Sequence, residues 1–83
     1  MKGNGTMHHI TLYTRHGCHL CERAKQDIIE LKKKIHFSFE EKDIEQSDEL
    51  TERYGLMIPV VQIDGEEVAH GIVNKFDISK RLQ

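Results

Sequence analysis

Residues 9–24 read HITLYTRHGCHLCERA, and the pattern of apolar side chains changes within this stretch. Residues 9–14 alternate between apolar and polar side chains, which is typical of a strand. Apolar residues then recur at the spacing of a helix, whose buried face is predicted to carry Leu20, Ala24, Ile28, Leu31 and Ile35. The only two cysteines of the chain, Cys18 and Cys21, lie where the two patterns meet. The sequence therefore predicts that both cysteines lie at the start of a helix.

A cysteine at the start of a helix loses its proton more readily than an ordinary cysteine. It faces unpaired backbone N–H groups and the positive end of the helix dipole, and both favour the thiolate over the thiol. The thiolate is the form that attacks a disulfide, and a second cysteine one turn later is well placed to resolve the mixed disulfide. We expect Cys18, ahead of the helix, to be the more exposed of the two. Cys21 is expected on the same face as Ala24 and Ile28.

The length and composition limit the class of protein. Eighty-three residues predict one small domain, and a formal net charge of −2 gives no reason to expect nucleic acid as a partner. No apolar run approaches the roughly 20 residues that span a bilayer. Residues 1–7 lack the apolar core of a secretory signal, so we expect a flexible lead-in there and a single domain at residues 8–83. This indicates the reducing cytoplasm, where a C-x-x-C pair is more often catalytic or metal-binding than structural.

The remaining elements follow from periodicity, caps and turns. Ser47 and Asn74 are predicted N-caps, Gly55 is a predicted C′ residue, and Asp64-Gly65 is typical of a type I′ hairpin. The predicted order is β-α-β-α-β-β-α, an α/β arrangement with a mixed four-stranded sheet and helices on both faces. The strands are expected at residues 9–14, 35–43, 58–63 and 66–70, and the helices at 19–34, 48–54 and 75–82.

The chain resembles the thioredoxin fold and, within it, the small glutaredoxin-like family. The resemblance lies in the segments LYTRHGCHLC (12–21), DIE (43–45), EL (49–50), RYG (53–55) and IPVVQIDG (58–65), which together span most of residues 10–72. A C-x-x-C pair alone is a weak signal. A C-x-x-C pair that follows a strand, combined with a single proline opening the later hairpin, is a strong one.

The resemblance implies a role for several residues. Cys18 would be the nucleophile and Cys21 the resolving thiol. Pro59 would be a cis proline facing them, and Ile58 would offer its backbone to an extended substrate. Arg15 and His19, which flank the thiols, are the other candidate substrate contacts. No metal site is expected, because the six histidines include no second convincing pair of ligands.

The chain departs from the family pattern at two places. The residue two before the first cysteine, commonly a proline, is His16. Glutathione-using members usually follow the hairpin with a Gly-Gly pair and an Asp-containing turn, whereas residues 68–74 read VAHGIVN and only Gly71 matches. We therefore expect no tightly bound cofactor, and the second departure weakens the case for glutathione as a ligand.

The leading hypothesis is a dithiol thiol–disulfide oxidoreductase that reduces protein disulfides or glutathione mixed disulfides. An upstream reductant, either glutathione or a thioredoxin-reductase-type system, would recycle it, and the protein is expected to be a monomer away from membranes. The alternative is a binding module that holds Cu(I) between Cys18 and Cys21, because soft thiolates suit that ion. Such domains have the order β-α-β-β-α-β. A third hypothesis is an iron–sulfur carrier that bridges two subunits through Cys18.

Overall fold

The computed structural model describes residues 7–83, so the predicted lead-in lies outside the described residues except for Met7. The elements follow in the predicted order, with one short 3₁₀ helix, η1, in addition. They are β2 (His8–Thr14), α1 (His19–Lys32), β3 (Phe37–Asp43), η1 (Ile44–Gln46), α2 (Asp48–Tyr54), β4 (Val60–Ile63), β5 (Glu66–His70) and α3 (Lys75–Leu82). None of the helices formed by residues 7–83 is long and apolar enough to cross a bilayer.

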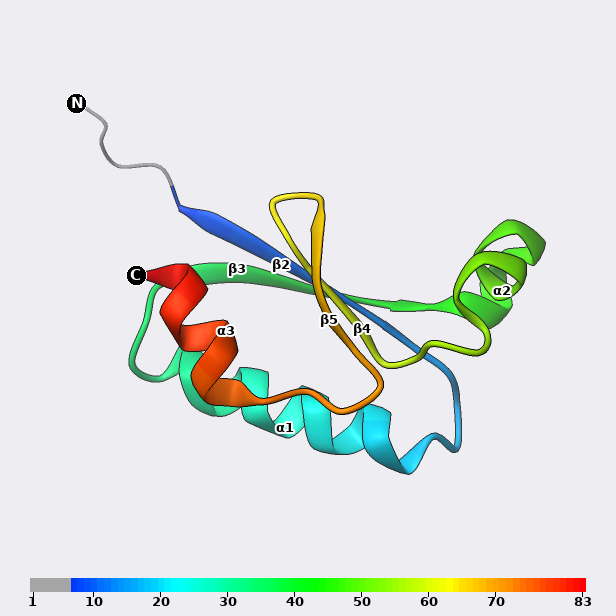
Figure 1. Ribbon diagram of the computed structural model, residues 1–83, viewed down its shortest axis with the longest axis horizontal. Coiled ribbons are helices and arrows are strands. Elements are labelled where there is room, and N and C mark those ends of the chain that lie inside the picture. The colour runs from blue at the N-terminus through cyan, green and yellow to red at the C-terminus, as the bar shows by residue number, and fades with distance from the viewer. Residues whose placement is uncertain (1–6) are drawn as a thin grey trace.

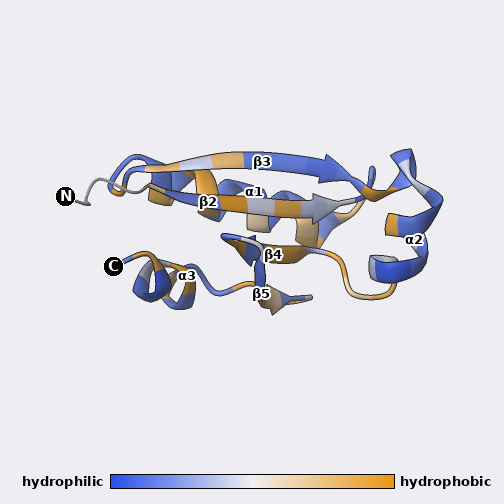
Figure 2. Ribbon diagram, turned by 90° about the horizontal axis from the view of Figure 1, so that it is seen from above, coloured by the Kyte–Doolittle hydropathy of each residue, from blue (hydrophilic) through white to orange (hydrophobic). Residues whose placement is uncertain are grey.

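The four strands form one mixed sheet in the order β3-β2-β4-β5 (Figures 1 and 2). β2 pairs in parallel with β3 and antiparallel with β4, and β4 pairs antiparallel with β5. The edges are therefore β3 and β5. Figure 2 shows that β3 becomes hydrophilic along its second half, where Glu40, Glu41 and Lys42 lie. Charged side chains on an edge strand disfavour pairing with another chain.

Successive side chains of β2 point to opposite faces of the sheet and enter two separate apolar clusters. Ile10 and Leu12 pack against α1 and α3, whereas Tyr13 packs toward α2. Figure 1 shows α1 and α3 together on one side of the sheet, with α2 at its far end. The helices α1 and α3 pack on the face that Ile10 and Leu12 share, and α2 packs on the face of Tyr13. The prediction of helices on both faces is therefore confirmed. The large cluster consists of Ile10, Leu12, Ala24, Ile28, Leu31, Phe37, Val61, Ile63, Ile78 and Leu82, and the small cluster consists of Tyr13, Ile44, Tyr54 and Val60.

Three predicted boundaries are wrong by two residues. The helix α1 ends at Lys32 instead of residue 34, because the next turn tightens and the backbone N–H of Lys33 bonds to Glu30 O. Ile35 is still tied to this turn through Leu31 O, so β3 begins at Phe37. β4 begins at Val60 instead of residue 58, because the N–H of Ile58 bonds to Tyr54 O at the end of α2.

Two further predictions concern single residues and are also wrong. Leu20, predicted on the buried face of α1, is 46% exposed, and Cys21 takes the buried position instead. Gly55 is the C-cap of α2 and has a right-handed φ of −54°, so it is not a left-handed C′ residue. It is a glycine for a different reason, since a Cβ there would lie 2.5 Å from Thr51 O.

The caps and the hairpin turn are as predicted. Ser47 and Asn74 are the N-caps of α2 and α3. Asp64 and Gly65 have φ of 53° and 86°, which is the geometry of a type I′ turn and explains the glycine. The turn is tied back to the start of β2, because Asp64 accepts hydrogen bonds from the His8 ring (2.6 Å) and from the His9 N–H (2.9 Å).

Candidate active site

Cys18 is the N-cap of α1, as the sequence predicts. Its backbone is extended (φ −88°, ψ 111°), and its Sγ accepts a hydrogen bond of 3.2 Å from the N–H of Cys21. A tight turn leads into it, in which the Cys18 N–H bonds to Arg15 O at 3.2 Å and Gly17 has a φ of 80°. Cys18 and Cys21 form a disulfide, with their Cα atoms 5.2 Å apart. One turn of helix therefore holds the two sulfurs in reach of each other.

The two cysteines differ in their exposure. Cys18 is half-buried, whereas Cys21 is 2% exposed and lies on the face of α1 that also buries Ala24 and Ile28. An attacking partner therefore reaches Cys18 first. This is the difference in exposure that the sequence predicts.

Pro59 lies at the end of the sheet where β2 leads into the cysteine loop. Tyr13 pairs with Val60, so Pro59 is next to the last residues of β2. The Ile58–Pro59 peptide bond is cis, as the resemblance implies, and Pro59 is buried. The N–H of Gly71 bonds to both Met57 O (3.1 Å) and Pro59 O (2.8 Å). The side chain of Ile58 packs against the small cluster.

The flanking residues take unequal positions. Arg15 is half-buried, and its terminal Nη2 lies 3.5 Å from the place that a Cβ of Gly55 would occupy. Its Nε is buried without a hydrogen-bond partner among residues 7–83. His16 and His19 are both exposed. The guanidinium therefore lies against the end of α2, whereas the two histidines face solvent.

A polar cleft of about 600 Å³ adjoins the cysteine loop and was not predicted from the sequence. On one wall, Glu41 accepts a hydrogen bond from Thr14 Oγ1 (3.0 Å) and forms an ion pair with Lys25 (3.0 Å). This contact with Glu41 raises the pKa of Lys25. Lys25 is four residues after Cys21 on α1, so the pair also links the cysteine helix to β3. The cleft is lined by Thr14, Arg15, His16, Gly17, Glu22, Glu41, Asp43 and Gln46.

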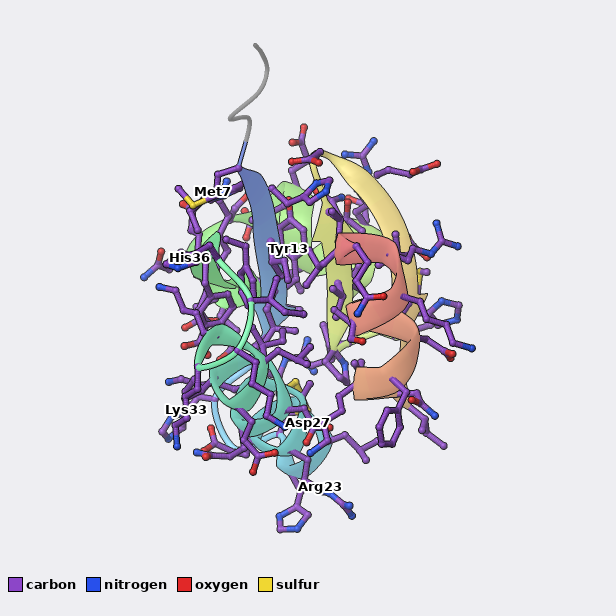
Figure 3. The ribbon with its side chains drawn as sticks, turned by 90° about the vertical axis from the view of Figure 1, so that its left-hand side faces the viewer. Met7, Tyr13, Arg23, Asp27, Lys33 and His36 are labelled. Atoms are coloured by element: carbon purple, nitrogen blue, oxygen red, sulfur yellow. A yellow bond between two sulfur atoms is a disulfide. The ribbon has the colours of Figure 1, made fainter. Side chains whose placement is uncertain are left out.

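A second hollow, which we call the α1–loop groove, lies between α1 and the loop that follows β5. Its volume is about 200 Å³, and it is lined by Leu20, Arg23, Ala24 and Asp27 of α1 and by residues 71–73. Figure 3 shows Asp27 on the side of α1 that faces α3, with Arg23 at the lower end of the same helix. The sequence did not predict this groove, because the helical spacing of Leu20 predicts a buried side chain.

The first amides of α3 are already occupied. Asn74 Oδ1 accepts hydrogen bonds from the N–H groups of Phe76 (2.8 Å) and Asp77 (3.3 Å). Asp77 also places a carboxylate in the first turn. This end of α3 follows residues 68–74, where glutathione-using relatives usually have a glycine pair and an Asp-containing turn and this chain matches only at Gly71.

Two further histidines make contacts of their own. His9, at the opposite end of the sheet, bonds through its ring to Ser38 Oγ (2.6 Å) and Glu40 (3.3 Å). His70, which pairs with Val60 next to Pro59, lies 3.3 Å from Glu67. Within residues 7–83, no three side chains of His, Cys, Asp or Glu gather as a metal site would require.

A family model and several solved structures match the chain and agree with the predicted fold. The glutaredoxin-like domain family (DUF836) matches residues 9–83 of the chain. Among solved structures, protein Ne2328 from Nitrosomonas europaea is 28% identical with a TM-score of 0.83, and the match covers 100% of both chains. A structural genomics target protein from X. campestris is 27% identical with a TM-score of 0.74, over 88% of this chain and 93% of that one. A comparison with curated proteins finds no match.

More distant structures share the fold alone. A mutant thioredoxin from Halobacterium salinarum is 16% identical with a TM-score of 0.70, over 90% of this chain and 71% of that one. The sheet, the three helices and the cysteine pair at the start of α1 thus define a thioredoxin-fold protein. Because the family match covers nearly the whole chain, the chain belongs to the glutaredoxin-like (DUF836) family.

Proposed function

We propose that the chain is a dithiol thiol–disulfide oxidoreductase in which Cys18 is the nucleophile and Cys21 the resolving thiol. The observation that carries the proposal is the unequal position of two sulfurs that are close enough to bond. Cys18 caps α1 within reach of an attacking group, and Cys21 is buried one turn later. A helix N-terminus stabilises a thiolate, so the accessible sulfur is also the better nucleophile.

The reaction proceeds in two exchanges. The Cys18 thiolate attacks one sulfur of the substrate disulfide, which forms a mixed disulfide and releases the other substrate sulfur as a thiolate that takes a proton from water. Cys21 then loses its proton and attacks Cys18 Sγ, which releases the second substrate thiol and leaves the Cys18–Cys21 disulfide. The substrate has gained two electrons and two protons. Two molecules of glutathione, which leave as glutathione disulfide, or a thioredoxin-reductase-type system supply the two electrons that restore the dithiol.

The substrate in this proposal is a protein disulfide or a glutathione mixed disulfide. It meets the protein at Cys18, with the backbone at Ile58 and Pro59 opposite and with Arg15 and His19 beside it. The position of Pro59 directly before β4, next to the last residues of β2, supports this assignment. We propose that the protein acts as a monomer in the cytoplasm.

The copper-handling alternative is less well supported. It predicted the order β-α-β-β-α-β, whereas η1 and α2 separate β3 from β4 here and the family match is to a glutaredoxin-like domain. A titration that gives tight Cu(I) binding, with no reduction of any disulfide, would reverse this ranking.

Two serine variants test the roles of the cysteines. Cys18→Ser is expected to lose disulfide reduction in a coupled assay, because the attacking sulfur is missing. Cys21→Ser is expected to accumulate a covalent adduct whose mass is that of the protein plus half of the substrate. Full turnover by the Cys18 variant would refute the assignment.

The reductant is identified by a separate assay. The wild-type protein is supplied with electrons either from glutathione and glutathione reductase or from thioredoxin reductase, with the same disulfide substrate in both. The electron source that supports turnover is then identified as the reductant of the Cys18–Cys21 disulfide. Failure of both, with full reduction by dithiothreitol, would point to another reductant.

A further inference from the structure

A hollow at the end of α1 farthest from the cysteines has no part in the proposed function. We call it the α1–α3 pocket, because its lining residues lie within residues 30–35 and 75–83. Figure 1 shows this end of α1 next to α3, with the cysteine loop at the other end of the helix. The volume of the pocket is about 580 Å³, within the roughly 300–1,000 Å³ of pockets that hold small molecules.

One part of the α1–α3 pocket is apolar. Phe76, in the first turn of α3, is 69% exposed and belongs to neither of the two apolar clusters of residues 7–83. Leu31, a member of the large cluster, and the half-buried Ile35 line the same pocket. The pocket therefore joins the edge of the core to an aromatic ring that is held in water. A ligand with an apolar body would gain from covering this surface.

The other part of the α1–α3 pocket is cationic. Lys75 forms an ion pair of 2.6 Å with Glu30, and this contact is the main cause of the lowered pKa of Glu30. The charges of Lys33 and Lys34 lower the same pKa further, so both lysines are within electrostatic reach of Glu30. Neither lysine forms an ion pair with any of residues 7–83. Two positive charges therefore remain without a partner in the lining of the pocket.

The two parts together limit the class of ligand. A purely apolar molecule would leave both unpaired lysines unused. A small inorganic anion would leave Phe76 in water and would depend on exposed charges alone, which salt screens. The first amides of α3 offer it no further donors, because Asn74 Oδ1 already accepts from Phe76 and Asp77. A molecule that carries one negative group on an apolar body matches both parts.

We propose that the α1–α3 pocket binds an aliphatic carboxylate whose alkyl chain covers Phe76. The carboxylate lies at Lys33 and Lys34, and the chain continues toward Leu31 and Ile35. Because the pocket lies at the opposite end of α1 from the disulfide, this inference goes beyond the dithiol function and does not depend on it.

The test compares three probes that share parts of one structure: octanoate, octan-1-ol and acetate. Each is titrated into the isotopically labelled, oxidised wild-type protein at neutral pH and low salt, and amide shifts are followed by NMR. Octanoate is expected to bind roughly tenfold or more tightly than acetate, because several methylene groups leave water. It should bind about threefold more tightly than octan-1-ol, which is the range of exposed ion pairs.

The location of the shifts is part of the test. The amides that respond to octanoate should lie in residues 30–35 and 75–79, and those of the cysteine loop should not respond. Equal binding of octanoate and octan-1-ol would overturn the role of the lysines, and equal binding of octanoate and acetate would overturn that of the apolar surface. The absence of a saturable shift at these residues would overturn the whole inference.

Two pairs of variants locate the site. Phe76→Ser is expected to weaken octanoate binding severalfold, whereas Leu56→Ser, which removes an exposed apolar side chain outside the pocket, should keep the wild-type affinity. Lys34→Gln should bring the affinity for octanoate close to that for octan-1-ol, and Lys42→Gln, the same change on β3, should not. The same spectra show whether each variant is folded. Equal losses in a variant and its control would contradict the proposed site.

Discussion

Ile28 belongs to the large cluster and has no exposed surface. It projects from α1 into this cluster, to which β2 contributes Ile10 and Leu12 and β4 contributes Val61 and Ile63. Its neighbour in the sequence, Ile29, is 37% exposed on the other side of the same helix. The two isoleucines therefore have the same chemistry and the same helix but opposite surroundings.

We expect Ile28→Ala to lower the free energy of unfolding by about 2–5 kcal/mol, since it removes buried carbons and leaves a cavity. Denaturant unfolding of the oxidised protein measures the loss. Ile29→Ala is the control and should cost about 1 kcal/mol or less, in the range of surface changes. Equal losses in the two variants would contradict the assignment of the buried face of α1.

At the scale of the elements, α3 depends on a single cap. Asn74 satisfies two of the first N–H groups of the helix, and Ile78 and Leu82 then reach the large cluster. We expect Asn74→Ala to lower the free energy of unfolding by about 0.5–2 kcal/mol. Asn74→Asp, whose carboxylate also accepts from the N–H groups, should remain near the wild-type value in the same denaturant measurement. Equal destabilisation by both changes would mean that the amide has another role.

The turn between β4 and β5 makes the stability of the fold depend on pH. Hydrogen bonds from the His8 ring and the His9 N–H lower the pKa of Asp64. A carboxyl whose pKa is lower in the folded state stabilises the fold above its unfolded pKa, and this stabilisation is lost as the pH falls through the folded pKa. The loss should therefore occur below about pH 4, the usual range of an aspartate.

We expect Asp64→Asn to flatten the pH dependence of the denaturant midpoint in this acidic range. The wild-type protein should lose more stability than the variant between pH 5 and pH 2, with each compared to its own value at pH 5. Glu66→Gln is the control, since it removes a carboxylate near the same turn that makes no hydrogen bond or ion pair within residues 7–83. The same flattening in the control would show that the effect is general and does not come from the tie to β2.

At the scale of the whole molecule, β2 is a central strand that connects the two apolar clusters. It pairs with strands on both sides and contributes to both apolar clusters, whereas within residues 7–83 α2 contributes to the small cluster only. Regions with few buried contacts open at lower free energy than the core. We therefore expect the amides of residues 10–13 to show the slowest hydrogen exchange and those of α2 to exchange faster, as NMR measures. Equal protection in α2 would contradict this order of stability.

The sequence was sufficient for the order of the elements, because periodicity, caps and turn residues agreed. It was sufficient for the position of the two cysteines as well, because the helix start and the C-x-x-C pair coincide. It failed where a contact distant in the chain decides the outcome. Leu20 has the spacing of a buried residue, but Cys21 is buried in its place, and no local pattern shows this. The error at Gly55 is local, because the residue is still right-handed at the end of α2 and its close neighbour, Thr51 O, lies one turn back in the same helix.

One amide joins two parts of the site that the chain separates by a hairpin. The N–H of Gly71 is shared between the carbonyls of Met57 and Pro59, and the next residue, Ile72, forms the wall of the α1–loop groove. This shared hydrogen bond fastens the loop after β5 to the segment that enters β4. A substitution that shifts either segment is therefore expected to shift the other as well.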